Sequence, residues 1–351
     1  AVPAGGALAV DRHGFAAMVT EAIRNHPNIT VVAEEVTDIP EGDVVIASGP
    51  LTSDALADKL AALFGSTDTL HFFDAAAPLV AFDSVDMTSA YFASRYDKGT
   101  PDYINCPMDR AQYETFYQAL MEAKTAPVHG FEDSKVFEGC MPVEVMAKRG
   151  MQTLCFGPLK PKGLTDPRTG KMPYAVLQLR QDDAADTLYN LVGFQTRLLI
   201  PEQKRVFGLI PGLEKARYAR FGAMHRNTFL NSPGLLDQDF RLREGLYFAG
   251  QMTGVEGYVE SAASGMLVGI ETAARVLGLE SVDFPQETAI GALGLYISGG
   301  SVGYFQPMNI NFGIIKPLEY RVKGKRNKNA EISRRSLEII EELKDREVLK
   351  L

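Results

Sequence analysis

The fold is decided by the stretch Gly245-Leu246-Tyr247-Phe248-Ala249-Gly250-Gln251-Met252-Thr253-Gly254-Val255-Glu256-Gly257-Tyr258-Val259-Glu260-Ser261-Ala262-Ala263-Ser264-Gly265. It begins with an apolar run of strand length, continues in a Gly-rich turn, and passes into a helix of small residues near Tyr258. Glycines in such a turn let backbone approach a ligand, and a helix N-terminus offers unpaired N–H groups and a positive dipole end. The stretch favours a site for a pyrophosphate or a flavin edge, although such glycines also serve packing alone.

An earlier strand ends in a similar turn, Ile46-Ala47-Ser48-Gly49, and a helix capped by Thr52 or Ser53 follows it. Strand, turn and capped helix in succession predict a parallel, doubly wound sheet. The two turns resemble those that hold the cofactor in two-dinucleotide flavoproteins, but Gln251 replaces the usual acid and no early GxGxxG unit is present. The candidate cofactor-binding residues are Ser48, Gly49, Pro50, Gly250, Gln251, Thr253, Gly254, Glu256, Gly257 and Tyr258.

Between these turns, aromatic residues with Pro and Gly punctuation replace the regular pattern and predict an inserted α+β domain. The predicted fold is therefore α/β, with a Rossmann-like FAD-binding domain interrupted by that insertion. We expect a FAD-binding domain at 1–80 and 216–280, the insertion at 81–215, and a basic C-terminal segment at 281–351. Further expected elements are helices at 14–26, 110–124 and 332–349, strands at 29–36 and 70–74, and a loop at Cys106-Pro107. On the helix at 110–124, one aromatic face predicts core rather than an RNA-stacking surface.

Several longer runs resemble the family of bacterial folate- and FAD-dependent tRNA (uracil-5-)-methyltransferases. They are Tyr103–Met108, Phe137–Gly150, Leu188–Thr196, Met224–Phe229, Gly250–Tyr258 and Phe305–Gly313. The related glucose-inhibited division family shares the late Gly-rich turn but not the run Phe137-Glu138-Gly139-Cys140. The resemblance implies transfer of a methylene from 5,10-methylenetetrahydrofolate, by way of FAD, to C5 of the T-loop uridine of tRNA, with NAD(P)H as reductant. Members of the family begin with a FAD-binding Gly-rich unit upstream of the part that Ala1–Leu8 matches, so we expect that unit to be missing here.

The charge of the chain is segregated. The net charge is −8 overall, but residues 1–144 carry 8 basic and 22 acidic side chains, residues 145–226 carry 14 and 6, and residues 227–351 carry 14 and 16. Two cationic regions, 145–226 and 321–335, favour a polyanionic partner, although charged runs also simply solvate a surface. The candidate RNA-binding residues are Lys148, Arg149, Lys160, Lys162, Lys204, Arg205, Arg226, Lys325 and Arg326.

Cys140 is the candidate catalytic residue. Uracil C5 becomes nucleophilic only after something adds to C6, and a thiolate suits that addition. Pro142 fits the first position of a helix, which would place the Cys140 thiol before a helix N-terminus, where its pKa falls. A small buried hydrophobic role is the alternative, and we expect it for Cys155; Cys106 is expected to be structural. Glu256 either hydrogen-bonds the cofactor or complements the helix dipole.

Composition excludes several other classes of protein. At 351 residues, 46% hydrophobic and 23% charged, the chain suits a globular protein, and no apolar run is long enough to span a membrane. Three cysteines fit neither a disulfide framework nor a metal site, the five histidines lack metal-ligand spacing, and the expected compartment is the cytoplasm. Besides the methyltransferase, a non-catalytic tRNA-binding remnant and a flavoprotein modifying wobble uridines remain as alternatives. No stable protein partner is implied.

Overall fold

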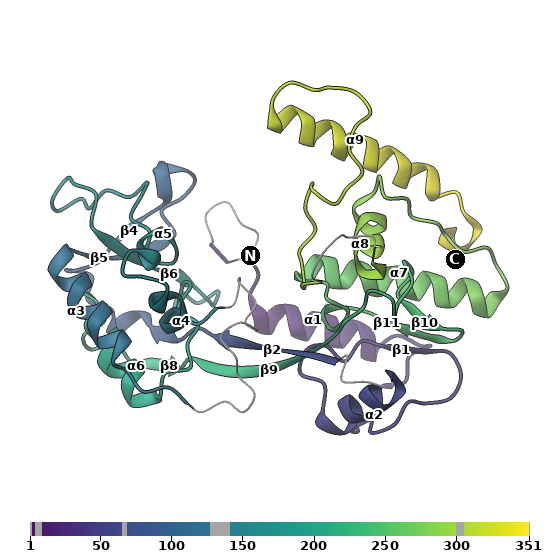
Figure 1. Ribbon diagram of the computed structural model, residues 1–351, viewed down its shortest axis with the longest axis horizontal. Helices are drawn as coiled ribbons and strands as arrows, with labels where there is room; N and C mark the ends of the chain where they lie inside the picture. The colour runs from purple at the N-terminus through teal and green to yellow at the C-terminus, as the bar shows by residue number, and fades with distance from the viewer. Residues whose placement is uncertain (1, 4–8, 65–68, 127–140, 300–304, 351) are drawn as a thin grey trace. The chain divides into compact units, whose positions relative to one another are not determined.

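The computed structural model describes residues 2–3, 9–64, 69–126, 141–299 and 305–350, which form two compact units (Figure 1). Unit 1 comprises residues 1–33 and 73–225, and unit 2 comprises residues 34–72 and 226–351. Strands β2 (Thr69–Ala76) and β9 (Ala223–Leu230) pair with each other, and each contains a point where the chain passes between units. The domain boundaries at 80, 215 and 280 stay a prediction, whereas the contacts group residues 1–33 with 73–225.

Unit 1 is built on a six-stranded antiparallel sheet in the order β4-β5-β6-β7-β3-β8. The strands are β3 (Leu79–Ala81), β4 (Tyr91–Ala93), β5 (Tyr103–Met108), β6 (Ala175–Gln181), β7 (Leu188–Leu191) and β8 (Tyr218–Arg220). The helices are α1 (Arg12–Arg24), α3 (Arg110–Met121), α4 (Val143–Lys148), α5 (Thr153–Phe156) and α6 (Ile200–Phe207), with short 3-10 turns η1 (Phe82–Ser84) and η2 (Arg95–Asp97). The antiparallel pairing and the separate helices fit the α+β character expected of the insertion.

Helix α3 supplies much of the core of unit 1. Asp109 caps it by accepting a hydrogen bond from the Gln112 backbone at 2.8 Å, while the Gln112 side chain accepts from the Asp109 backbone at 2.9 Å. Tyr113, Phe116 and Leu120, spaced at i, i+3 and i+7, are fully buried against the sheet. Burial of each such side chain stabilises the fold by about 1.5–3 kcal/mol. This confirms that the aromatic face of the helix is core.

Unit 2 contains a three-stranded sheet in the order β1-β11-β10, in which β1 (Val44–Ile46) and β11 (Leu246–Phe248) are parallel and β10 (Arg241–Arg243) is antiparallel. Its helices are α2 (Asp54–Phe64), α7 (Tyr258–Leu277), α8 (Ala289–Ser298) and α9 (Lys325–Leu343), with 3-10 turns η5 (Gln251–Thr253) and η6 (Glu347–Lys350). Ser53 caps α2, since its Oγ accepts from the Leu56 backbone at 3.4 Å.

Helix α7 runs back along the sheet of unit 2 (Figure 1). Near its start, the Ser264 hydroxyl accepts a hydrogen bond from the Gly250 backbone at 2.8 Å, just after β11. Near its end, Arg275 Nε lies 3.1 Å from Asp43 Oδ1, just before β1. A helix that follows a strand and returns along it is the half-unit of a parallel α/β sheet.

Four local expectations were wrong. Residues 29–36 form no strand, and Val31 and Val32 are exposed, because β-branched side chains adopt strand geometry only where a neighbouring strand pairs with them. The expected loop at Cys106-Pro107 is the end of strand β5. Pro107 is tolerated there because β4 pairs only with Tyr103–Asn105, which leaves the backbone of Pro107 one neighbour, β6.

The other two corrections concern helix ends. Pro142 is the residue before α4 rather than its first residue. The C-terminal helix begins at Lys325 instead of Ile332, so several basic residues lie on it rather than before it. Ile332 is the buried residue that anchors α9, packing with Ala292 of α8 and Ile315.

Candidate functional site

Two backbone turns of unit 2 meet at the carboxyl end of its parallel strands. Ile46 pairs with Phe248, and the Ala249 backbone donates to the Ile46 carbonyl at 3.0 Å, so the chain leaves both strands at the same level. The two turns are in contact, since the Ser48 hydroxyl of the first turn lies 3.7 Å from Met252 Sδ of the second. The structure therefore brings together the residues predicted from the two separate sequence motifs. The carboxyl end of parallel strands is where α/β sheets bind ligands.

Side-chain hydrogen bonds hold the late turn, which begins at Gly250. Thr253, fully buried, donates from its hydroxyl to the Gly250 carbonyl at 2.8 Å. The Thr253 carbonyl in turn accepts from the Ser232 hydroxyl at 2.8 Å. These contacts fix the geometry of the turn, and the cofactor-binding role of Thr253 stays a prediction.

The glycines of the two turns differ in what surrounds them. All have positive φ, +77° at Gly49, +75° at Gly250, +88° at Gly254 and +94° at Gly257. A Cβ on Gly49 would meet nothing within 4 Å, and one on Gly250 would meet only Ser261 at 4.0 Å. A Cβ on Gly254 would lie 2.4 Å from the Phe305 ring. A Cβ on Gly257 would lie 2.1 Å from Oε2 of Glu260, in the first turn of α7. Gly49 and Gly250 thus leave room for a ligand, whereas neighbouring side chains fill the space beside Gly254 and Gly257.

Helix α7 begins at Tyr258, directly after the late turn. Gly257 precedes the helix, no side chain caps it, and the side chains of Tyr258 and Val259 are 97% and 80% exposed. A twenty-residue helix presents its first backbone N–H groups and positive dipole end here. Beside it, Gln251 Nε2 lies 3.1 Å from Glu256 Oε1, so this carboxylate is hydrogen-bonded within the turn. The cofactor role and the dipole role of Glu256 both stay predictions.

A third segment completes the site and was not among the predicted site residues. The Glu256 backbone donates to the Met308 carbonyl, and the Met308 backbone donates to the Gly254 carbonyl, both at 3.0 Å. Asn309 Nδ2 lies next to Gly257. The only sequence signal was the run Phe305–Gly313, which carries the family resemblance but has no periodicity that would assign it to the turn.

Two of the three cysteines, Cys106 and Cys155, lie in the described part of the chain. Cys140 lies outside the residues that the structure describes. Cys106 is buried in β5, and burial, with a smaller effect of Glu214, raises the pKa of its thiol to about 12, so it stays protonated and unreactive. Cys155 is half-buried against the core of unit 1, and burial raises its pKa as well. Both fit the structural roles expected of them.

The predicted RNA-binding side chains divide between the units. Lys148, Arg149, Lys160, Lys162, Lys204 and Arg205 are exposed in unit 1, and Lys325 and Arg326 are exposed on the first turn of α9 in unit 2. The Lys204 ammonium lies 5.4 Å from the ring centroid of Phe221, and Arg205 pairs with Glu202 at 2.6 Å. The position of Arg226 is in β9, and its side chain lies outside the described part.

The described part of the chain contains neither a membrane-spanning helix nor a cluster of metal-binding side chains. No helix there is long and apolar enough to cross a membrane. No group of three or more His, Cys, Asp or Glu side chains there could hold a metal ion.

The fold and the site define a class of dinucleotide-binding α/β protein, and comparisons with known proteins agree. Residues 2–280 match the family model described as "Glucose inhibited division protein A". Two crystal forms of Aquifex aeolicus GidA superpose with TM-scores of 0.65 and 0.63 at 15% and 17% sequence identity. They cover 95% and 97% of this chain, which spans 58% and 62% of theirs. This likeness confirms an α/β fold of the type found in that family.

Curated relatives are much closer in sequence. The methylenetetrahydrofolate–tRNA-(uracil-5-)-methyltransferases TrmFO of Anoxybacillus flavithermus and Bacillus pumilus are 60% and 59% identical to this chain over 342 residues. Each match covers 97% of the chain and 79% of the relative. The chain therefore belongs to the glucose-inhibited division protein A family and, within it, to the branch of these methyltransferases. The resemblance inferred from the sequence is confirmed.

Proposed function

We propose that this protein methylates C5 of the T-loop uridine of tRNA, with the carbon supplied by 5,10-methylenetetrahydrofolate. The observation that carries the proposal is 60% identity over 97% of the chain to a curated methylenetetrahydrofolate–tRNA-(uracil-5-)-methyltransferase. The relatives at 57–60% identity all carry that name, which disfavours a wobble-uridine-modifying flavoprotein. Because tRNA is the substrate, we propose the cytoplasm as the location.

The residues of the site fit FAD. Gly49 and Gly250 leave open space beside the backbone at the carboxyl ends of β1 and β11, and the uncapped start of α7 faces an anionic group favourably. These positions would hold FAD together with Ser48, Pro50 and the turn at 251–258. FAD, when bound, supplies the electrons that reduce a transferred one-carbon unit, and NAD(P)H is the proposed source of those electrons.

The chain's own residues have two further tasks in this proposal. The exposed cations of unit 1 hold tRNA phosphates, whose neutralisation supplies most of the affinity. The thiolate of Cys140 adds to C6 of the uridine or assists removal of the C5 proton. Protonated Cys106 and half-buried Cys155 are poorer candidates because burial raises the pKa of both thiols.

The test uses unmodified tRNA transcript, 5,10-methylenetetrahydrofolate, FAD and NADPH or NADH. We expect 5-methyluridine in the nucleoside digest by mass spectrometry, located to the T loop by fragment mapping. Cys140→Ala should lose the product while keeping the flavin absorbance of the purified protein, and Cys155→Ala is the matched control that keeps both. Yellow protein without product would refute the reaction, and normal methylation by Cys140→Ala would refute the role of the thiol. Colourless protein that still binds tRNA would support the non-catalytic alternative.

A further inference from the structure

A cavity of about 440 Å³ lies in unit 1, remote in sequence from the Gly-rich turns. It opens between the end of β5, the start of α3 and the turn that follows Asp166. Its size falls in the range of roughly 300–1,000 Å³ of small-molecule sites. One part of its lining is apolar and aromatic, from Met108, Met172, Pro173 and Tyr174. The other part is polar and carries the cations Arg110, Arg168 and Lys171 together with the carboxylates Asp109 and Asp166.

The Arg168 guanidinium is fixed in the wall of this cavity. Its Nε and Nη2 donate to the two oxygens of Asp166 at 3.0 and 2.8 Å, and its Nη1 donates to the Thr88 carbonyl at 2.8 Å. The Asp166 side chain is only 8% exposed, whereas that of Arg168 is 42% exposed. Because each Nη carries two N–H groups and uses one, two donors of a rigid fork remain for a ligand.

Lys171 adds a second cation on the same turn. Its backbone pairs with Asp166 across the turn, which fixes its position, and the side chain is exposed. No side chain among the described residues pairs with its ammonium group. By contrast, Arg110 pairs with Glu114 at 2.7 Å, and Asp109 is occupied as the cap of α3. Arg168 and Lys171 therefore both offer donors to a ligand in the cavity, beside the Nη groups that Arg110 does not use with Glu114.

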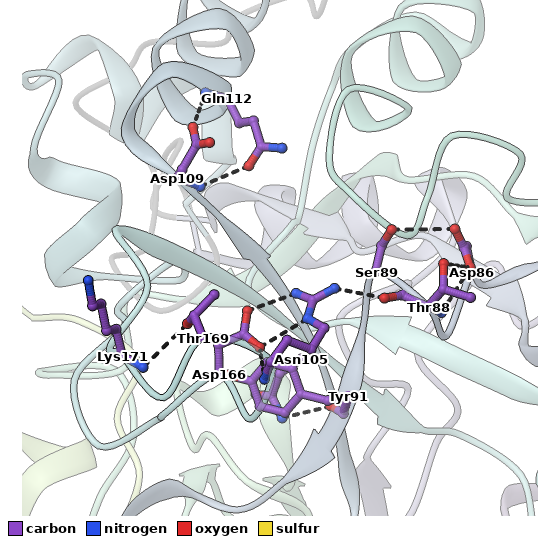
Figure 2. A network of polar contacts seen from close by, with 11 residues as sticks. Asp86, Thr88, Ser89, Tyr91, Asn105, Asp109, Gln112, Asp166, Thr169 and Lys171 are labelled. Atoms are coloured by element: carbon purple, nitrogen blue, oxygen red, sulfur yellow. Dashed lines mark hydrogen bonds and ion pairs between the residues drawn. The ribbon is translucent and has the colours of Figure 1, made fainter.

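A buried group behind this wall lacks a partner. Tyr91 is 7% exposed, and its hydroxyl has no hydrogen-bond partner among the described residues. Burial and the nearby Asp166 carboxylate raise the pKa of this hydroxyl to about 12. An unsatisfied buried polar group costs about 1–3 kcal/mol, and natural proteins keep few of them. Figure 2 shows the Tyr91 ring beside Asp166, which lines the cavity, whereas Tyr91 itself does not.

We infer that this cavity binds a nucleoside phosphate, with the base against Met172 and Tyr174 and the phosphate at Arg168 and Lys171. A planar base suits the apolar lining because every base has a π-face that can stack on an aromatic ring such as that of Tyr174. A phosphate suits the guanidinium fork of Arg168 beside the ammonium group of Lys171. The nucleoside phosphate comes either from an unpaired nucleotide of RNA or from a free nucleotide. The inference rests on the proposed function, since the cavity lies in the unit that contains nearly all of the cationic segment 145–226.

The test measures binding by fluorescence anisotropy with Lys171→Ala, Met172→Ala and the control Lys98→Ala, an exposed lysine of unit 1 outside the cavity. The probes are a hairpin RNA with an unpaired loop, a fully paired duplex of equal length, and labelled adenosine monophosphate. Lys171→Ala and Met172→Ala should each weaken hairpin or mononucleotide binding by about tenfold, with little effect on the duplex. Loss confined to the hairpin identifies RNA as the source, and loss with the mononucleotide identifies a free nucleotide.

Equal binding by Lys171→Ala, Met172→Ala and Lys98→Ala for every probe would overturn the inference. Far-UV circular dichroism melts of all three variants exclude unfolding as the cause of a loss. Methylation by the unmutated protein is measured separately. Failure of the proposed function shows as no product from that protein, whereas failure of the cavity shows only in the variants.

Discussion

Substitution of Gly254 by alanine tests whether packing against Phe305, rather than ligand approach, requires glycine in the late turn. The residue has φ +88°, and a Cβ would lie 2.4 Å from Cζ and 2.9 Å from Cε1 of Phe305. The left-handed backbone costs an alanine about 1–2 kcal/mol, and the overpacked ring adds about 1–3 kcal/mol. Gly254→Ala should therefore lower the free energy of unfolding by about 2–5 kcal/mol, a large part of the roughly 5–15 kcal/mol typical of a domain.

The matched control is Gly278, which ends α7 in the same left-handed region, with φ +67° and nothing within 4 Å of its Cβ position. Gly278→Ala should cost only the backbone term of about 1–2 kcal/mol. Because the chain contains no tryptophan, urea unfolding is followed by far-UV circular dichroism without added ligands. The two variants should differ by roughly 0.5 M or more in midpoint.

A second substitution isolates the ring. In Gly254→Ala/Phe305→Leu the clash is relieved, so the double variant should be more stable than the sum of the single changes by about 1 kcal/mol or more. If Gly254→Ala is no more destabilising than Gly278→Ala, or if Phe305→Leu recovers no stability, the packing explanation is wrong.

Three further predictions concern charge. Burial, and to a smaller extent the Glu271 carboxylate, raise the pKa of Asp239 to about 6. The folded state therefore keeps a proton that the unfolded state loses near pH 4, and the free energy of unfolding should fall as pH rises from about 4 to about 6. Asp239→Asn should flatten this fall, measured as urea midpoints across that pH range. Glu144→Ala removes a buried carboxylate that accepts hydrogen bonds from the Thr196 hydroxyl and the Arg197 backbone N–H. The variant should lose about 3–5 kcal/mol of the free energy of unfolding in the same urea assay, and a loss below about 1 kcal/mol would contradict this expectation. Lys160→Ala and Lys162→Ala should each lower the slope of log affinity for tRNA against log salt by about 1, and unchanged slopes would remove them from the interface.

Sequence patterns predicted that the two turns would meet, but not which other segment would contact them. The two Gly-containing turns, at Ser48-Gly49 and Gly250, could be paired in advance because a strand-turn-helix pattern places both at the carboxyl end of a parallel sheet. The contribution of Met308 could not be foreseen, because it acts through backbone hydrogen bonds that any residue could make. The same limit explains strand 29–36, where local propensity was strong but no partner strand was specified.

The core of unit 1 was predictable only in part. Tyr113, Phe116 and Leu120 follow a helical period, so their burial on α3 could be derived. The cavity at Arg168 could not, since it depends on an ion pair between neighbours in a turn and on Thr88, 80 residues earlier in the chain. Contacts of that kind have no periodic signature.

The pairing of β1 with β11 also constrains the order in which the chain can fold during synthesis. Val44 to Ile46 leave the ribosome about 200 residues before their partners Leu246 to Phe248, so this pair closes a very long loop. Every strand of the six-stranded sheet, ending with β8 at Arg220, is made before β11. Unit 1 should therefore complete its six-stranded sheet first, while β1 has to wait about 200 residues for its partner β11.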